Sequence, residues 1–499
     1  MPDVSGGEYE IVDLDATEIA MLFDDKKRVK IPEFTQVFID HFNVRRVNGR
    51  IVCYDRTKKQ YVAGIEVLKK RMLDIISTLN REQRNEIWDR VSILMSDVNG
   101  EEYPPQYVKF ANGTYDLETG QLLPSNPSHV ILNTVPWNYD ENAQHELTDR
   151  TINKLCCGDA SIRALLEEMI GYIFYRSAEF KKAFVLTGAG NNGKSVFMDM
   201  LAALTGFENF CALPIQQLGE RFLTGEVYGM LAILYDDMPE TYVDTASTFK
   251  NLVSGGILVG EEKGQKPYKF RPHAVPIYAA NEMCRIRDST GAAMSRFIPI
   301  PFNAVFSPTD ADYDPHIRQK LITREGMEYL VQLGLAGLRR LLSNKKFTQS
   351  EVVDKELDKL KEDNDPIIGF VKENAPYERE RDDYYAEYEK YCIKAGSRAS
   401  IMKRDRFVRR VQLHANVELV RSTGGERYFR LKDAKSVVIE HEDTSPLSVY
   451  KDYVKRNKLQ LLDEVPLCDL MSWAEAEELR RQGYVFTDDK GDYHVLADL

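Results

Sequence analysis

The sequence of 499 residues lacks the apolar runs that membrane proteins need and the cysteine patterns that indicate metal sites or disulfide frameworks. A membrane-spanning helix requires about 20 consecutive apolar residues, and no segment approaches that length. The seven cysteines are odd in number and include no CxxC pair, so we expect no zinc site and interpret all seven as packing residues in a reducing compartment. The N-terminal segment carries acids where a signal peptide carries bases, so we expect a cytoplasmic protein without membrane contact.

An overall excess of positive charge is also absent, because 66 Lys and Arg residues stand against 78 Asp and Glu residues, a formal net charge of −12. A uniformly basic nucleic-acid binder is therefore excluded, although a local basic surface is not. The charge is uneven, since residues 390–435 carry 13 bases and 4 acids, a local charge of +9. Residues 1–25 carry eight acids and no base, which predicts a flexible acidic tail, and residues 436–499 carry 14 acids and 7 bases, which predicts an acidic C-terminal extension.

The chain is predicted to contain several domains, because 499 residues exceed the size of one ordinary hydrophobic core. Residues 26–146 are predicted to form a small α+β domain in which the Asn48-Gly49 turn joins two strands of a hairpin. Residues 147–340 are predicted to begin with a helical bundle and to continue as an α/β core. The apolar runs AFVLT, MLAILY and VPIYAA predict its buried strands, and residues 341–379 are predicted as a helical linker.

The strongest motif is a glycine-rich loop, GAGNNGKS, which matches the pattern GxxxxGK[ST] from Gly188 to Ser195. It follows the strand-like AFVLT and opens the helical SVFMDMLAALTG, which is the context that such a phosphate loop requires. Glycines let backbone N–H groups turn toward phosphate oxygens at a helix N-terminus. Lys194 can reach the β- and γ-phosphates, and the Ser195 hydroxyl can ligate Mg²⁺. The sequence therefore predicts a nucleoside triphosphate site, whose binding residues are Gly188, Gly190, Asn191, Asn192, Gly193, Lys194 and Ser195.

Three polar features downstream of this loop predict the rest of an NTPase site. MLAILY ends in Asp236 and Asp237, which suit a magnesium ligand and a water-activating base. VPIYAA ends at Asn281, whose amide can orient the attacking water, and Arg296 follows 15 residues later in MSRFIPIPF. Each feature alone has an ordinary explanation as a turn former or a solvated side chain. Their order predicts that Asp236, Asp237, Asn281 and Arg296 are catalytic, and that Ser195 and Asp236 bind the metal.

Two further segments predict contact with DNA. In EEKGQKPYKF, turn residues join two extended arms, so we expect a hairpin with Lys263 and Lys266 at its tip, either gripping a phosphate backbone or only solvated. Residues 380–435 contain two helical segments and then two strand-like segments, the order of a winged helix-turn-helix. Its basic residues predict duplex DNA binding, with a protein-contact winged helix as the alternative. The residues expected to contact DNA there are Lys403, Arg404, Arg406, Arg409, Arg410 and Arg427.

These motifs, in this order, resemble the superfamily-3 helicases of viruses and plasmids, in particular the phage/plasmid primase–helicase family typified by the satellite-phage primase–helicase and the poxvirus nucleoside triphosphatase. GAGNNGKS, ILYDD, YAANEMCRIRD and MSRFIPIPF are similar to that family's ATPase motifs. The resemblance implies an α/β AAA+-type P-loop motor that uses ATP and Mg²⁺, with a small mixed N-terminal domain and a C-terminal winged helix-turn-helix. It also implies a homo-oligomer, usually a hexamer, with single-stranded DNA in its pore, 3′ to 5′ travel, and Arg296 completing the site of a neighbouring subunit.

The function expected from this resemblance is that of an ATP-dependent replicative DNA helicase or replication initiator of a phage, plasmid or mobile element, in the cytoplasm of the host cell. The alternative is an ATPase that melts or remodels origin DNA, or loads other replication proteins, without processive unwinding. A structural initiator that only marks DNA is a third alternative. The chain has Ser254-Gly255-Gly256-Ile257 where the family has Gly-Gly-Asp. The residues before the motor already resemble the helicase's own leading domain, so we expect no primer synthesis and a separate primase or polymerase as a partner.

Overall fold

The structure is a computed structural model, and it describes residues 14–47, 49–95, 102–238, 246–261, 267–281, 286, 292–310, 313–364, 366–394, 401–422, 424–432, 485–487 and 493–495. The chain divides into two compact units, Met1–Lys372 and Glu373–Leu499, which we describe separately. Within the described ranges, no helix is both long enough and apolar enough to cross a membrane.

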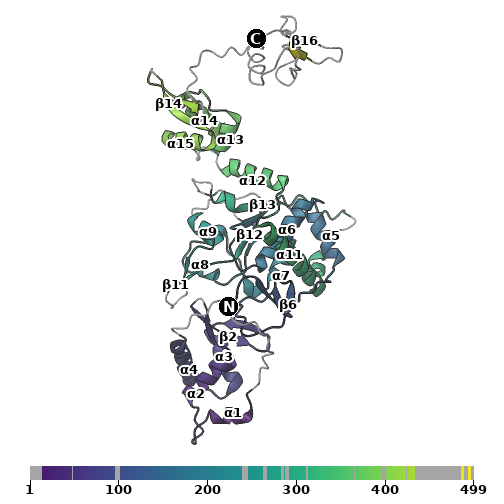
Figure 1. The fold of residues 1–499 in the computed structure, drawn as a ribbon, viewed down its shortest axis with the longest axis vertical. Coiled ribbons are helices and arrows are strands. Elements are labelled where there is room, and N and C mark those ends of the chain that lie inside the picture. The colour runs from purple at the N-terminus through teal and green to yellow at the C-terminus, as the bar shows by residue number, and fades with distance from the viewer. Residues whose placement is uncertain are drawn as a thin grey trace. The chain divides into compact units, whose positions relative to one another are not determined.

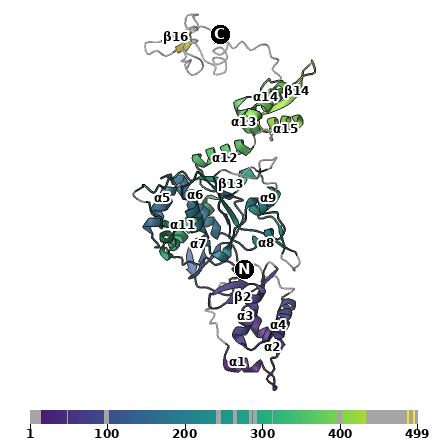
Figure 2. The ribbon, with the colours of Figure 1, turned by 180° about the vertical axis from the view of Figure 1, so that it is seen from behind.

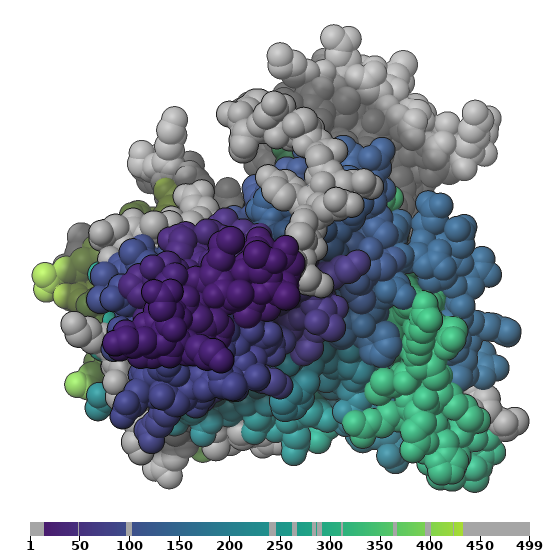
Figure 3. All heavy atoms as spheres, turned by 90° about the horizontal axis from the view of Figure 1, so that it is seen from below, coloured from purple at the N-terminus to yellow at the C-terminus, as the bar shows by residue number. Residues whose placement is uncertain are grey.

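The first unit begins with a small α+β domain, drawn in purple in Figures 1 and 3. Its antiparallel sheet has the order β1-β2-β3, and the predicted hairpin is confirmed because β1 pairs with β2, with Val47 opposite Arg50. Gly49 at the turn has a φ of +81°, in the left-handed region that favours glycine. The helices pack around Phe34, Phe38 and other buried apolar side chains. The elements are α1 (Ala16–Met21), α2 (Ile31–His41), β1 (Arg45–Val47), β2 (Arg50–Asp55), β3 (Gln60–Ala63), α3 (Ile65–Ile75) and α4 (Arg81–Leu94).

Helix α1 lies inside the segment that the charge pattern predicts as a flexible tail. The Asp15 carboxylate accepts a hydrogen bond from the Glu18 N–H at 2.7 Å, and the Glu18 carboxylate accepts one from the Asp15 N–H at 2.9 Å. This reciprocal capping box satisfies N–H groups that a helix start otherwise leaves without partners. The structure therefore differs from the prediction over residues 14–25, whereas residues 1–13 lie outside the described ranges.

A second small sheet and two helices connect the N-terminal domain to the central sheet. The sheet is antiparallel with the order β4-β5-β6, formed by β4 (Tyr107–Phe110), β5 (Gly113–Asp116) and β6 (Gln121–Leu123). Helices α5 (Glu146–Leu155) and α6 (Ala160–Phe174) follow, as the apolar spacing of this region predicts. The α6 helix is capped by the Asp159 carboxylate, which accepts from the N–H groups of Ser161 and Ile162.

The central sheet is parallel throughout and has the order β13-β7-β12-β9-β8. The three runs predicted as buried strands form β7 (Ala183–Thr187), β9 (Ala232–Tyr235) and β12 (Val275–Ala280). The edge strands are β8 (Phe210–Cys211) and β13 (Phe297–Pro301). The prediction of an α/β core is confirmed, and the structure shows that its sheet is parallel. Because parallel strands all end at the same edge, the residues that follow β7, β9 and β12 are neighbours.

Helices cover both faces of this sheet, as parallel strands require. Alternate side chains of β7 enter different cores, since Phe184 and Leu186 pack with α6, α7 (Lys194–Thr205) and α11 (Arg324–Asn344), whereas Ala183 and Val185 face the opposite side. On that second side lie α8 (Leu223–Glu226) and α9 (Ala246–Val253), and the two helical layers are visible in Figures 1 and 2. The described part of the first unit also contains η1 (Phe207–Asn209), η2 (Ile215–Gln217), η3 (Met294–Arg296), α10 (Ile317–Leu321) and α12 (Glu351–Asn364).

A short hairpin leaves this second side, formed by β10 (Leu258–Gly260) and β11 (Tyr268–Phe270) in antiparallel pairing. These strands are the two arms predicted around the lysine-bearing turn. Lys263 and Lys266 themselves lie outside the described residues.

The second unit contains two helices followed by a two-stranded antiparallel sheet, after α13 (Pro366–Glu373), which spans the boundary between the units. The helices are α14 (Arg381–Lys394) and α15 (Arg404–His414), and the strands are β14 (Val417–Arg421) and β15 (Arg427–Leu431). Their core is aromatic, because the rings of Tyr384, Tyr388, Phe407 and Phe429 are buried against one another. Further along, β16 (Val485–Thr487) pairs with β17 (Tyr493–Val495) inside the segment predicted only as an acidic extension.

Candidate nucleotide-binding site

The glycine-rich loop connects the end of β7 to the start of α7, which begins at Lys194. Gly193, the residue before the helix, has a φ of +85°. A Cβ atom there would lie 2.7 Å from a Leu155 methyl group and 3.0 Å from the Phe306 ring, so both backbone conformation and space require glycine. The helix N-terminus therefore opens directly onto the loop, where the N–H groups of its first turn and its dipole favour an anion.

The Lys194 side chain turns back into the loop that precedes it. Its ammonium contacts the carbonyl oxygens of Gly188 and Ala189, the Asn192 Oδ1 at 3.2 Å and the Asn281 Oδ1 at 3.3 Å. Burial lowers the pKa of Lys194, and the nearby carboxylates of Asp236 and Asp237 act in the opposite direction. A partly desolvated cation surrounded by neutral oxygens is well placed to bind an anion that enters the loop.

Asn192 fixes the loop to the residues that follow β13. Its side-chain amide donates to the Phe302 carbonyl at 3.1 Å, and the same side chain accepts from the Lys194 N–H at 3.4 Å. Asn192 is 5% exposed, and Phe306 continues the contact because its N–H donates to the Asn191 carbonyl at 2.9 Å. The loop conformation is therefore held by the chain that follows β13 as well as by its own glycines.

The carboxylates predicted for catalysis lie at the same edge of the sheet. Asp236 and Asp237 follow β9, Asn281 follows β12, and β12 pairs with both β9 and β7. Asp237 has a φ of +61°, and its N–H donates to the Asp236 carboxylate at 3.0 Å. The structure thus brings Lys194, Asn281 and the two aspartates together, as the sequence predicts.

The residues present could hold Mg²⁺ only with help from a bound nucleotide. No group of three or more His, Cys, Asp or Glu side chains that could bind a metal occurs in the part of the chain that the structure describes. Ser195 and Asp236 are both exposed and are oxygen donors of the hard type that Mg²⁺ takes. Magnesium usually keeps several waters and binds through one or two protein oxygens plus phosphates, so this donor set fits.

Asp199 is a residue of the site that the sequence argument missed. It lies on α7, its carboxylate forms an ion pair with Arg318 of α10 at 3.0 Å, and burial together with the Asp236 charge raises its pKa. Its spacing of four residues from Ser195 places both on one face of the helix, which is the signal that could have found it. Arg318 could not have been found in this way, because its partner is 119 positions earlier in the chain.

Arg296 lies at the amino ends of the parallel strands, whereas the glycine-rich loop lies at their carboxyl ends. It immediately precedes β13, and Phe297 pairs with Ala183 at the start of β7. Its guanidinium donates to the Ser254 Oγ at 3.2 and 3.3 Å and to the Ala292 carbonyl. The structure therefore does not bring Arg296 to the glycine-rich loop of its own chain.

Lys182 is a second basic residue at that edge, and the sequence argument also missed it. Its ammonium donates to the Ser295 carbonyl at 2.7 Å, and burial, followed by the charges of Arg296 and Lys361, lowers its pKa. Only the packing of β7 against β13 places Lys182 beside Arg296, so no local pattern could have shown it.

The basic residues predicted to bind DNA in the second unit divide into two groups. Lys403, Arg404, Arg406, Arg409 and Arg427 have exposed side chains, and Arg404 also forms a 3.2 Å ion pair with Asp382.

Arg410, by contrast, is only 8% exposed. Arg410 lies on the face of α15 that also buries Phe407 and Val411, so we remove it from the exposed basic surface.

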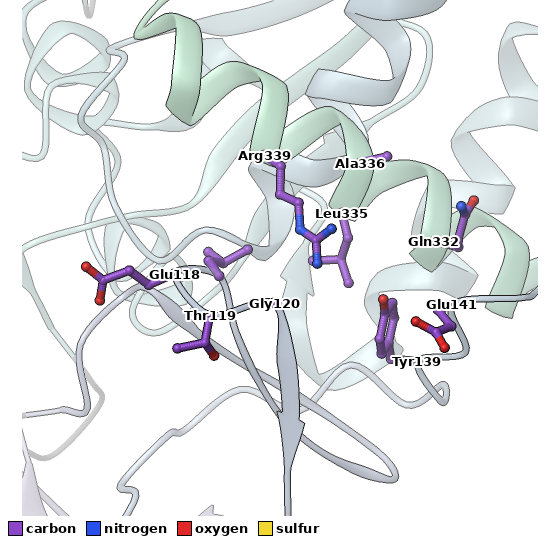
Figure 4. Close-up of a pocket in the computed structure, with 10 residues that line it drawn as sticks. Glu118, Thr119, Gly120, Tyr139, Glu141, Gln332, Leu335, Ala336 and Arg339 are labelled. Atoms are coloured by element: carbon purple, nitrogen blue, oxygen red, sulfur yellow. The ribbon is translucent and has the colours of Figure 1, made fainter. Parts of the chain in front are cut away.

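A separate hollow of about 550 Å³ lies between the β5–β6 turn and α11 (Figure 4). Arg339 extends from α11 toward Gly120 of the turn, and Tyr139 and Glu141 line the other side. The Arg339 guanidinium lies 5.2 Å from the centre of the Tyr115 ring. No residue of the phosphate loop lines this hollow, so it is not the predicted nucleotide site.

Comparisons with known proteins match two segments of the chain to family models. Residues 44–157 match a family described as "D5 N terminal like", and residues 186–296 match a family of unknown function, DUF5906. The first segment contains most of the N-terminal domain, and the second contains the phosphate loop, both aspartates, Asn281 and Arg296.

Two curated viral proteins are similar to this chain in sequence. The "Putative helicase L207/L206" of Acanthamoeba polyphaga mimivirus is 25% identical over 211 residues, which cover 40% of this chain and 22% of that protein. The "Putative helicase 121R" of Invertebrate iridescent virus 3 is 25% identical over 218 residues, which cover 40% of this chain and 23% of that protein. The matched part thus spans less than a quarter of either relative.

Two solved structures of the NrS-1 C-terminal region are among those that match this chain. One, an A form without ligand, has a TM-score of 0.44 at 12% sequence identity and covers 80% of this chain and 98% of that one. The other, spanning residues 305–718 of NrS-1, has a TM-score of 0.43 at 14% identity and covers 81% and 100%.

Proposed function

We propose that the chain is an ATP-dependent DNA helicase of a viral or phage replication system. The observation that carries the proposal is the contact of Lys194 with Asn281 at the carboxyl ends of the strands, where Asp236 and Asp237 also lie. The similarity to two putative viral helicases supports a helicase-like, NTP-hydrolysing function. ATP as the nucleotide, 3′ to 5′ movement and the superfamily-3 subtype are parts of the proposal that rest on the resemblance of the motifs.

The phosphate loop would bind the triphosphate through its backbone N–H groups and through Lys194. On binding, the Lys194 ammonium exchanges loop carbonyls for phosphate oxygens, which carry more negative charge and therefore bind it more strongly. Mg²⁺ held by Ser195 and Asp236 would neutralise charge on the β- and γ-phosphates. Asp237 would accept a proton from the attacking water, and Asn281 would orient that water by a hydrogen bond.

The position of Arg296 supports action on a neighbouring copy of the chain. Arg296 lies at the amino ends of the strands, away from the phosphate loop. Arg296 and Lys182 therefore form a positive site that could bind the nucleotide of a second subunit. A guanidinium suits the developing charge of a transferring phosphoryl group because it is always ionised and planar. The proposal therefore includes a ring of like subunits, with a hexamer as the expected size.

DNA contact is proposed at two places. The β10–β11 hairpin carries Lys263 and Lys266 in its turn segment and would contact single-stranded DNA in the ring. The second unit, proposed as a winged helix, would contact duplex DNA through the exposed arginines of α15 and Arg427 of β15. We propose no membrane partner, a cytoplasmic location in the host, and a separate primase or polymerase as a replication partner.

The decisive experiment compares the wild type with Lys194→Ala in ATP hydrolysis and in strand displacement from a forked duplex. Lys69→Ala is the matched control, because it removes a half-buried lysine of the N-terminal domain whose ammonium donates to Asn85. We expect wild type and control to hydrolyse ATP and separate strands, and Lys194→Ala to do neither. ATP hydrolysis without strand separation by the wild type would favour the alternative of a loader or origin-melting ATPase.

A further inference from the structure

The pairing of β10 with β11 is too short to keep this hairpin folded by itself. Each strand has three residues, and Leu258 and Phe270 at the base are buried in the core beneath the sheet. Toward the turn, Gly260 is opposite Tyr268. An isolated two-stranded hairpin is at best marginally stable in water, so the arms need a support near the turn.

That support is an arginine from the N-terminal domain. The Arg50 guanidinium donates to the Tyr268 hydroxyl at 2.8 Å, and its central carbon lies 5.1 Å from the centre of the Tyr268 ring. The same carbon lies 4.1 Å from the centre of the Tyr228 ring. The two tyrosine rings meet edge to face with centroids 5.4 Å apart, so one cation contacts both aromatic faces and one hydroxyl.

The rest of the contact makes the position of Arg50 specific. Tyr228 donates to the Val47 carbonyl at 3.3 Å. Val47 and Arg50, which flank the β1–β2 turn, therefore both contact the domain that contains the central sheet. Tyr268 in turn rests on Gly260, where a Cβ atom would lie 2.6 Å from its ring. The Tyr268 ring therefore packs directly on the backbone of β10, and holding the ring also holds the opposite arm.

We propose that Arg50 is a positioning residue that fixes the β10–β11 hairpin to the N-terminal domain, so that hydrolysis moves the hairpin and this domain together. The inference rests on the proposed function, in which the turn segment after Gly260 contacts DNA. Tyr268 is two positions after Lys266, so the contact with Arg50 adjoins the lysines that would bear the force of the DNA strand. Without the Arg50 contacts, that force would displace β10 and β11, and each ATP hydrolysed would move less DNA.

An arginine is required at this position for geometric reasons. The planar guanidinium can stack on one ring while an N–H at its edge donates to a hydroxyl, whereas a lysine ammonium is a point charge that cannot do both. Arg50→Lys should therefore restore only part of the function lost in Arg50→Ala. Tyr268→Phe removes the hydrogen bond and keeps the ring, so its defect should be smaller than that of Arg50→Ala.

The test compares these variants with Arg45→Ala, whose arginine makes its hydrogen bonds to Val44 and Asn43 inside the N-terminal domain. We would measure ATP hydrolysis without DNA, base pairs separated per ATP, and hydrogen exchange of peptides covering residues 258–270. We expect Arg50→Ala to hydrolyse ATP normally without DNA, to separate about tenfold fewer base pairs per ATP, and to exchange faster in the hairpin. Arg45→Ala should match the wild type in all three.

Two outcomes would overturn the inference. Hairpin exchange in Arg50→Ala equal to that in Arg45→Ala would show that Arg50 does not hold the arms. An equal loss of hydrolysis with and without DNA, together with a lower melting temperature, would show a general structural role. If the wild type itself fails to hydrolyse ATP or separate strands, the proposed function fails, and the exchange comparison alone then decides whether Arg50 fixes the hairpin.

Discussion

Arg296 offers the sharpest test of how the site is completed. Lys182, beside Arg296, and Gly188 in the loop are six positions apart along extended chain, which corresponds to about 20 Å at about 3.3 Å per position. That separation exceeds the reach of one arginine side chain. Replacing Arg296 by alanine should therefore leave ATP binding intact while lowering the hydrolysis rate, by about 10³–10⁵-fold if the arginine stabilises the transition state as a finger from a neighbour.

Mixing two inactive variants measures this arrangement directly. Arg296→Ala and Lys194→Ala would be combined in varying ratios, allowed to exchange subunits, and assayed for ATP hydrolysis. In an equal mixture, about one interface in four combines an intact Lys194 with an intact Arg296 from the next copy, so about a quarter of the wild-type rate should return. Arg324→Ala is the control, because this arginine pairs with Glu328 on the surface of α11 and should leave the rate unchanged.

The refuting result is equally clear. If hydrolysis in every mixture equals the weighted sum of the two variants, Arg296 does not act between subunits. Ser254→Ala adds a graded comparison, because it removes the hydroxyl that accepts from Arg296 and leaves the guanidinium in place. We expect it to slow hydrolysis far less than Arg296→Ala does, and an equal effect would mean that Arg296 only anchors the start of β13.

Two further predictions concern ionisation and DNA binding. Burial lowers the pKa of Lys109 from 10.5 to about 8. Between these two pH values the unfolded chain binds more protons than the folded chain, so this lysine's contribution to the free energy of unfolding rises with pH. In urea unfolding between pH 8 and 10, Lys109→Met should lose that rise, and identical slopes of stability against pH in variant and wild type would contradict the prediction. In the second unit, Arg406→Ala combined with Arg409→Ala should weaken duplex binding and reduce the slope of log affinity against log salt by about 2. Arg410→Ala should instead lower the melting temperature because its side chain is buried, and an unchanged salt slope in the double variant would exclude phosphate contacts by α15.

Three strands of the central sheet, β7, β9 and β12, could be predicted because they are largely buried on both faces. Such strands appear in the sequence as continuous apolar runs, and AFVLT and VPIYAA form β7 and β12 with every residue buried. The position of the glycine-rich loop could be predicted for the same reason, since it joins one of these runs to a helix. The β1–β2 hairpin depends on a signal that is equally local, the turn at Gly49, and its prediction is confirmed.

Two differences could have been resolved from the sequence with closer attention to helix signals. Asp15 and Glu18 have the spacing of a capping box, which outweighs the acidic charge of the region and starts α1. Arg410 is three residues after Phe407 and directly precedes Val411, so helical spacing places it on the apolar face of α15. In both cases net charge was a weaker guide than the position of each residue within its helix.

The remaining residues depend on contacts between distant segments. Arg50 and Tyr268 are 218 positions apart, and Lys182 and Ser295 are 113 apart. Nothing near Arg50 in the sequence distinguishes it from Arg45 or Arg46, which point to their own domain. Only the tertiary fold selects one arginine of the three to contact the β10–β11 hairpin.

The order of strands in the central sheet has a consequence for synthesis of the chain. β7 is the first of the five strands to leave the ribosome, yet its partners β12 and β13 are the last. At about 5–20 residues per second, β7 waits roughly 5–20 s with both edges unpaired, an apolar strand open to wrong pairing. A nascent chain that ends before Val275 lacks both partners of β7, so chaperones that bind extended apolar segments should bind residues 183–187 of such a chain.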